Sequence, residues 1–183
     1  MPISRLAPLA PPYPPALAAA LEAMMPPGVP PLLLFRTLAH NTRILEKIRA
    51  SNLLDRGSIP RREREIVILR ATARAGGEYE WGVHVAFFAA KVGLAQAQID
   101  ASVHGSPEDP AWSPRERLLV RLVDQLHETA RLDDALWGEL AACFEPAQLI
   151  ELVVLAGFYR TISCLVNGFA IALEEGAPRF PAR

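Results

Sequence analysis

The sequence predicts an all-α protein, a helical bundle, on three observations. Almost every segment after the first thirty residues has the apolar spacing of a helix, and no run alternates as a half-buried strand does. Most of the 17 prolines lie in the first 31 residues or at the start of an expected helix, where a missing N–H does no harm. With 183 residues, 51% of them hydrophobic, the chain can bury one good core. We therefore expect a Pro-rich N-terminal extension with a short helix over 1–30 and a single helical domain over 31–183.

The expected helices have recognisable ends. Ser113-Pro114-Arg115-Glu116 is a capping box with proline at the first helical position, and Gly76-Gly77 and Gly93 are natural left-handed stops. "IPRREREIVILRATA" and "SPRERLLVRLVDQL" start alike, which leaves coincidence and a helical repeat equally open. The expected helices, in order, lie near 14–24, 31–38, 42–53, 60–75, 79–91, 96–103, 114–129, 134–143 and 147–174.

Charge and composition limit the partners and the location. The net charge is −1 and both signs are interspersed, which argues against nucleic acid or a membrane surface as the main partner. Apolar runs such as "LIELVVLAGFY" are shorter than the roughly 20 residues of a membrane span. The first residues lack the basic start and apolar core of a secretory signal, so we expect a cytoplasmic protein. Cys143 and Cys164 lie far apart and are expected to be reduced thiols in the core.

The last expected helix predicts assembly. From Leu149 to Leu173 it is apolar on nearly all faces, and such a helix must be covered on all sides. A chain of this length has difficulty covering it alone. We therefore expect a homo-oligomer.

Three ionisable residues stand in the apolar stretch "EREIVILRATARAGGEYEWGVHVAFFAA". Glu65 shares a helix face with Ile68 and Leu69, and on the next helix Glu80 and His84 are four apart and therefore adjacent. A carboxylate beside an imidazole favours the protonated ring, as a proton donor near neutral pH requires. One interpretation is a proton-transfer site between two antiparallel helices. The other is a Glu80–His84 pair at a rim, with Glu65 paired to an arginine.

The stretch "RREREIVILRATARAGGEYEWGVHVAFFAAKVGLAQAQIDA" resembles the core of the carboxymuconolactone decarboxylase family, which includes the alkylhydroperoxidase D group. That group's motif is a Glu, eleven residues, and C-x-x-C-x-x-x-H. The Glu falls on Glu65 and the His on His84, while the cysteine positions fall on Gly77 and Glu80. "FRTLAHN" and the last helix extend the resemblance over about four-fifths of the chain, and "EYEWGVHV" is similar to the members without cysteines.

The resemblance implies an alkylhydroperoxidase D-like bundle, assembled as a trimer or hexamer, without a cofactor. Peroxide reduction needs an attacking and a resolving thiol, so this activity is not expected here. The family's other activity, decarboxylation of a carboxylated muconolactone, needs a proton donor near neutral pKa. We expect His84 to be that acid, Glu80 to orient it, and Glu65 to hold its other nitrogen or act as a base.

Substrate contacts are expected from cations and flat side chains near this stretch. The candidates for the substrate's carboxylate are Arg36, Arg70, Arg74 and Arg160, of which Arg36 and Arg74 are preferred. Tyr79 and Trp81 flank Glu80 and could wall a pocket for a ring, although aromatic side chains commonly serve packing alone. Asn167, with Ser163 and Tyr159, forms a polar line on the last helix that requires hydrogen-bond partners.

Two classes of function stay open. The first is a cofactor-free lyase or isomerase that acts on a small carboxylated ring or lactone. The second is a catalytically silent, oligomeric protein that binds a small ligand. A metal site built from Glu65, Glu80 and His84 is a minor third interpretation, because one histidine and two carboxylates make a weak ligand pattern, and we predict no metal.

Overall fold

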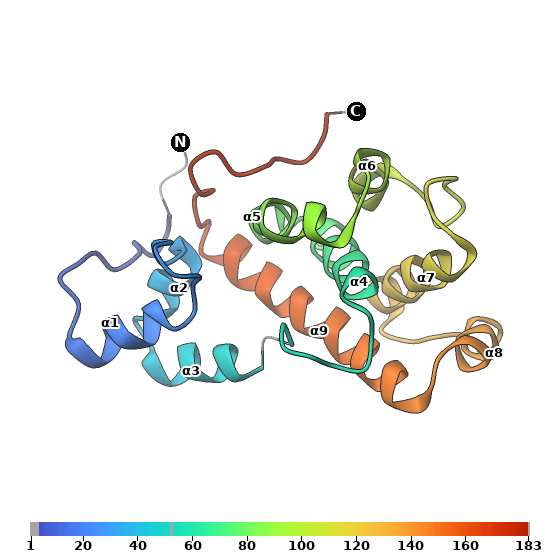
Figure 1. The fold of residues 1–183 in the computed structure, drawn as a ribbon, viewed down its shortest axis with the longest axis horizontal. Coiled ribbons are helices and arrows are strands. Elements are labelled where there is room, and N and C mark those ends of the chain that lie inside the picture. The colour runs from blue at the N-terminus through green and yellow to red at the C-terminus, as the bar shows by residue number, and fades with distance from the viewer. Residues whose placement is uncertain (1–3, 52, 183) are drawn as a thin grey trace.

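The computed structural model describes residues 4–51 and 53–182, and within them it contains helices and no strand, which confirms the all-α prediction. Figure 1 shows their arrangement. The elements are α1 (Pro15–Glu22), α2 (Leu33–Leu38), α3 (Thr42–Ala50), α4 (Arg61–Arg74), α5 (Glu78–His84), the π-helical turn η1 (Val85–Ala89), the 3-10 turn η2 (Ala90–Val92), α6 (Gln96–His104), α7 (Pro114–Thr129), α8 (Asp134–Cys143) and α9 (Pro146–Gly168).

Helices α4 and α9 form the centre of the bundle. Helix α4 packs against α5, α6, α7 and α9, and α9 also packs against α5, α7 and α8. Figure 1 shows α9 crossing the molecule, with α1–α3 on one side and α7 and α8 on the other. The central core takes fully buried aliphatic side chains from α4, α7 and α9, among them Val67, Ile68, Leu119, Leu122, Leu152 and Leu155.

Helices α4 and α7 run parallel and are joined by ion pairs along their length. The similar charged starts of the two helices therefore lie side by side. Three of the pairs each link residues 54 positions apart, as parallel helices in register require. They are Arg62–Glu116 at 2.8 Å, Arg70–Asp124 at 2.7 Å and Arg74–Glu128 at 2.6 Å.

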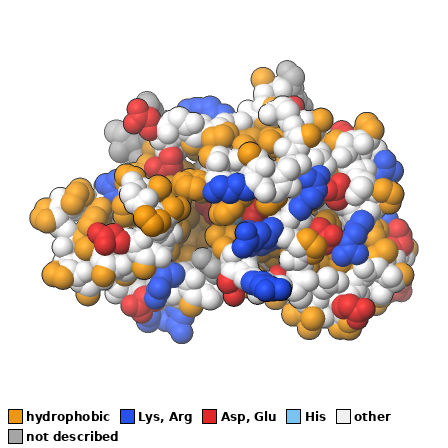
Figure 2. Space-filling view, viewed as in Figure 1, with side chains coloured by type: hydrophobic (Ala, Val, Ile, Leu, Met, Phe, Trp, Pro, Cys, Tyr) orange, Lys and Arg blue, Asp and Glu red, His pale blue; other side chains and the backbone are white. Residues whose placement is uncertain are grey.

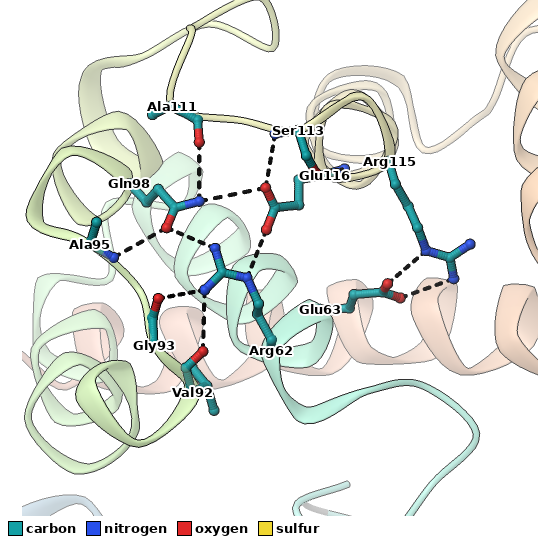
Figure 3. Close-up of polar contacts among 10 residues, drawn as sticks. All are labelled: Arg62, Glu63, Val92, Gly93, Ala95, Gln98, Ala111, Ser113, Arg115 and Glu116. Carbon is teal, nitrogen blue, oxygen red and sulfur yellow. Dashed lines mark hydrogen bonds and ion pairs between the residues drawn. The ribbon is translucent and has the colours of Figure 1, made fainter.

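Arg62 also fastens the segment that follows α5 (Figure 3). Its guanidinium donates to Gly93 O at 2.6 Å, to Val92 O at 3.2 Å and to Gln98 Oε1 at 2.8 Å. Glu116, which accepts from Arg62, also closes the predicted capping box by accepting from Ser113 N at 2.9 Å. The start of α4 is thereby held against the far end of the α5–η2 segment.

Three helix ends differ from the prediction. The helix expected over 79–91 is α-helical only to His84 and continues as the π-helical and 3-10 turns, before Gly93 ends it at φ 68°. The helix expected to reach 174 ends at Gly168, because Ala170 takes φ 50° and Ile171 N turns back to Val166 O at 2.9 Å. The helix expected over 42–53 ends at Ala50.

A second hydrophobic cluster joins the N-terminal helices to the bundle. Leu21, Leu34 and Leu45, from α1, α2 and α3, pack with Tyr79 of α5 and Ile162 of α9. The chain before α1 is also hydrogen-bonded to the end of α9, because Arg5 N donates to Phe169 O at 2.8 Å.

The structure shows how far the apolar helix α9 and the two cysteines are buried. Helix α9 has 23 residues and contains an 18-residue window with a mean hydropathy of 1.8, so by length and composition it could cross a membrane; 44% of that window is buried inside the protein. Cys143 and Cys164 are free and exposed, so the expectation of core thiols is wrong.

Candidate proton-transfer site

The Gly76-Gly77 turn sets α5 beside α4. Gly76 has φ 65°, a conformation that glycine adopts without cost. At Gly77 an added Cβ would lie 2.5 Å from Ser163 Oγ and 3.3 Å from Thr72 O, so the turn is pressed against α4 and α9. This close packing directs the inner face of α5 toward Glu65.

Glu65, Glu80 and His84 converge, as the two-helix hypothesis expects. His84 Nδ1 lies 2.7 Å from Glu65 Oε2, and His84 Nε2 lies 3.5 Å from Glu80 Oε1. The side chains of His84 and Glu65 are only 2% and 1% exposed. The group is therefore inside the protein and not at a rim.

Both carboxylates favour the charged imidazole. Burial lowers the pKa of His84, but hydrogen bonds with Glu65 and Glu80, together with their charges, outweigh it and raise the pKa to about 9. At neutral pH the ring is thus an imidazolium, which donates through Nδ1 to Glu65. Its Nε2–H points to the Glu80 side.

Arg64 supplies the second cation of the group. Its Nε and Nη2 donate to Glu65 Oε1 at 3.0 and 2.9 Å, and its Nη1 donates to Leu54 O at 2.9 Å. Glu65 is therefore paired on both oxygens, with Arg64 on one and His84 on the other. The rim hypothesis is correct in one respect: Glu65 does pair with an arginine.

Glu80 has an unused acceptor. Its Oε2 is buried and has no hydrogen-bond partner among residues 4–51 and 53–182. Leaving such an oxygen without a donor costs free energy, so it marks a position that a ligand or water can fill. It belongs to the same carboxylate that lies beside His84 Nε2, and the two together present one donor and one acceptor.

Aromatic rings enclose the imidazole. The rings of Phe88 and Tyr159 lie 5.1 and 4.9 Å from that of His84 between centroids, and the Tyr159 ring meets it edge-on. Burial and the neighbouring carboxylates raise the pKa of Tyr159, which keeps its hydroxyl neutral. Phe88 follows His84 by four residues, so helical spacing could have identified it, whereas Arg64 and Glu65 are consecutive, a spacing that does not predict contact on a helix.

The aromatic residues expected to contact substrate serve other contacts. Tyr79 points to the second cluster, where its hydroxyl accepts from Leu34 N at 3.0 Å and donates to Glu174. Trp81 Nε1 donates to Ser102 Oγ at 2.9 Å, and its ring packs on Phe180. The structure does not bring either to His84.

The predicted arginines and Asn167 are also held away from the imidazole. Arg36 donates to Leu9 O at 2.7 Å, Arg74 pairs with Glu128 at the far end of α4, and Asn167 donates to Ala75 O at 3.0 Å. Of the remaining candidates, Arg70 is buried in its pair with Asp124 and Arg160 donates to His127 O at 3.1 Å.

The described side chains do not form a metal centre. Over residues 4–51 and 53–182, no three histidine, cysteine or acidic side chains gather in a way that could hold an ion. At the predicted site His84 Nδ1 is occupied by Glu65, and Glu65 by Arg64, so two of the three groups are directed at each other.

The comparisons with known proteins agree on the fold. A family model described as the carboxymuconolactone decarboxylase family matches residues 40–125. The search of curated proteins finds no significant match.

Three solved structures illustrate the fold. An uncharacterized peroxidase-related protein from Silicibacter sp. TM1040 shares 17% identity over 96% of each chain, with a TM-score of 0.81. An uncharacterized peroxidase-related protein with an alkylhydroperoxidase AhpD core, from Ralstonia eutropha JMP134, shares 19% over 96% of this chain and 94% of that one, with a TM-score of 0.75. The debrominase Bmp8 shares 15% over 92% and 91%, with a TM-score of 0.74.

At these identities the solved structures establish an alkylhydroperoxidase D-like fold and no activity. The family model covers residues 40–125, and within this stretch Gly77 and Glu80 stand where the alkylhydroperoxidase D motif has its cysteines.

Proposed function

We propose that this protein is a cofactor-free lyase that acts on a small carboxylated ring or lactone, with His84 as the proton donor. The observation that carries the proposal is the buried imidazole of His84: its Nδ1 lies 2.7 Å from Glu65 Oε2 and its Nε2 lies 3.5 Å from Glu80 Oε1. The other oxygen of that carboxylate, Glu80 Oε2, has no hydrogen-bond partner among residues 4–51 and 53–182. At neutral pH the imidazole is protonated on both nitrogens, and Glu80 Oε2 can accept a hydrogen bond from a ligand.

The arrangement suits protonation at carbon. When the bond from a ring carbon to a carboxylate breaks, CO₂ leaves and the electron pair passes into an enolate conjugated with the ring carbonyl. The proton on His84 Nε2 then moves to that carbon, and water restores the proton to the imidazole. Glu65 keeps the ring oriented, since its Oε2 is paired with His84 and its Oε1 with Arg64.

The absence of motif thiols supports a proton-transfer reaction over peroxide reduction. Gly77 and Glu80 have no sulfur, and the two cysteines of the chain, Cys143 and Cys164, are on the exposed surface of α8 and α9. The fold also accommodates small rings elsewhere, since one structure of Bmp8 holds 2,3,4-tribromopyrrole.

One observation favours the second candidate, a silent ligand-binding protein. His84 is 2% exposed, and neither of two surface cavities, one at the start of α4 and one between α7 and α9, is lined by His84, Glu65 or Glu80. A closed site needs no further explanation in a silent protein, whereas an enzyme needs a local opening through which its substrate enters.

The test is turnover in deuterated water. The purified protein is incubated with carboxymuconolactone and related carboxylated lactones, CO₂ release is followed, and the product is analysed for deuterium at the former carboxyl-bearing carbon. We expect turnover in the wild type and a loss of about a hundredfold in His84→Gln, the size of a general-acid contribution. Ligand binding without turnover on any of these compounds would leave the silent protein as the better account.

A further inference from the structure

A cavity of about 390 Å³ opens at the start of α4, one residue in sequence from the proton-transfer site. Figure 2 shows lysine and arginine side chains gathered on this face, over the α3–α4 connection and the start of α4. The lining residues come from that connection, from α4 and from α9, and are Asp55, Arg56, Gly57, Ile59, Arg61, Arg64 and Glu151.

The cavity is lined by more arginines than acidic residues. Three lining residues are cationic and two are anionic, which leaves a formal charge of +1. One acid is engaged, because Glu151 Oε2 accepts from both Ser58 N and Ser58 Oγ at 2.6 Å and lies against the Gly57 backbone. For Arg56 and Arg61, no hydrogen bond or ion pair with another described residue is found, so their guanidinium groups are available.

Arg64 connects the cavity with the imidazole. Its side chain is 6% exposed, lines the cavity, and pairs with Glu65, which in turn pairs with His84. Its hydrogen bonds to Glu65 and Leu54 use three of its five N–H groups, so donors remain for a ligand in the cavity.

We infer that this cavity is a binding site for the carboxylate of a small cyclic acid. Guanidinium groups match a carboxylate through paired, charge-assisted hydrogen bonds. The formal charge of +1 suits a monoanion, and the two acids disfavour a dianion such as phosphate. Ile59, which is 7% exposed, adds an apolar wall for a ring.

The inference deepens the proposed function and rests on it only for the role of the ligand as substrate. The site gives the carboxylate of that substrate class a docking position next to Arg64, which Arg36 and Arg74 do not provide. Binding itself can be measured without any turnover.

Calorimetric titration of the full-length protein at low salt and pH 7 tests the site, with benzoate, benzamide and inorganic phosphate as probes. We expect about one benzoate per chain and much weaker binding of benzamide and phosphate. The double variant Arg56→Gln/Arg61→Gln should weaken benzoate at least about tenfold, as the loss of charge-assisted hydrogen bonds predicts. Arg131→Gln, an exposed arginine in the α7–α8 connection, is the matched control and should bind as the wild type does.

Two results would overturn the site: no benzoate binding by the wild type, or equal binding by the wild type and the double variant. Tighter binding of phosphate than of benzoate would overturn the assignment to a carboxylate. His84→Gln separates the two proposals, because it should lower turnover about a hundredfold and leave benzoate affinity within about twofold. Arg-dependent benzoate binding by a protein that turns over no lactone would refute the proposed function and leave the site standing.

Discussion

Glu80 is the residue at which this site departs most from the alkylhydroperoxidase D motif, where a cysteine stands. A carboxylate cannot attack a peroxide as a thiolate does, but it can raise the pKa of an adjacent imidazole and accept a hydrogen bond from a ligand. Both roles fit its place, 3.5 Å from His84 Nε2 and with one buried oxygen that no described residue donates to.

The raised pKa of His84 predicts a pH dependence of stability. The folded-state pKa of about 9 lies above the unfolded value of 6.5, so the stabilisation is fully present below pH 6.5 and is lost as the pH rises through 9. The difference corresponds to about 3 kcal/mol of unfolding free energy. Urea denaturation at pH 6 and pH 10, at constant protein concentration, should show this loss in the wild type and a much smaller one in His84→Gln. Equal losses in the two proteins would contradict it.

The positions of the two cysteines, outside the motif, predict that the protein does not reduce peroxides. Replacing Cys143 and Cys164 together with serine should leave lactone turnover nearly unchanged, because both thiols are exposed and neither occupies a motif position. An alkyl hydroperoxide assay should give only background rates in both proteins. Robust peroxide turnover that the double variant loses would overturn this argument.

At the scale of the element, the site depends on how closely the α4–α5 turn packs. Gly77→Ala would place a Cβ 2.5 Å from Ser163 Oγ, an overpacking that costs about 1–3 kcal/mol and displaces the start of α5. Gly138→Ala is the matched control: it lies in α8 with open space around it, and should stabilise by up to about 1 kcal/mol. Thermal and urea unfolding of the two variants measure the difference. If Gly77→Ala left the free energy of unfolding unchanged, the turn would have space for a Cβ, which would contradict the close packing.

The sequence predicts the elements better than their junctions. Periodicity and the Ser113 capping box identify α7, and the Glu65 to His84 spacing identifies the three residues that meet. It cannot predict Arg64, because its contact with the neighbouring Glu65 depends on where the α3–α4 connection places Leu54 O. Nor can it predict the π-helical turn after His84, since the sequence there has ordinary helical residues and no glycine or proline.

The arginines show why substrate contacts are harder to predict than the acid itself. From sequence, each arginine is a free cation, whereas in the fold Arg70 and Arg74 are paired with the acids of α7. Which cations stay available is decided by tertiary pairing. Arg56 and Arg61 line the cavity, and neither has a hydrogen bond or ion pair with another residue of 4–51 and 53–182.

At the scale of the molecule, α9 presents an apolar face that one chain leaves uncovered. Ile150, Val153 and Val154 are 67%, 38% and 51% exposed, and Trp137 of α8 is 49% exposed. The apolar character of this helix led us to expect a homo-oligomer, and these side chains are the surface on which we expect it to form.

Light scattering coupled to gel filtration tests this assembly. We expect a mass well above the 20.0 kDa of one chain, with a trimer or hexamer as the form that the family resemblance implies. Val154→Glu should shift the protein toward the monomer, because it places a charge in the interface, whereas Ala97→Glu, on the exposed face of α6, should not. A wild-type monomer would refute the expected oligomer.

The pKa of His84 is the quantity whose measurement tests the proposed role of this residue as proton donor most directly. Titration of the imidazole nitrogens by NMR, with His84→Gln to identify the resonance among the four histidines, gives the pKa in the intact protein. A buried donor held by Glu65 and Glu80 should titrate near pH 9 and remain protonated at neutral pH, and Glu65→Gln should lower its pKa. A His84 that titrates at or below 6.5 would be neutral when the reaction needs its proton, and would contradict the proposed role.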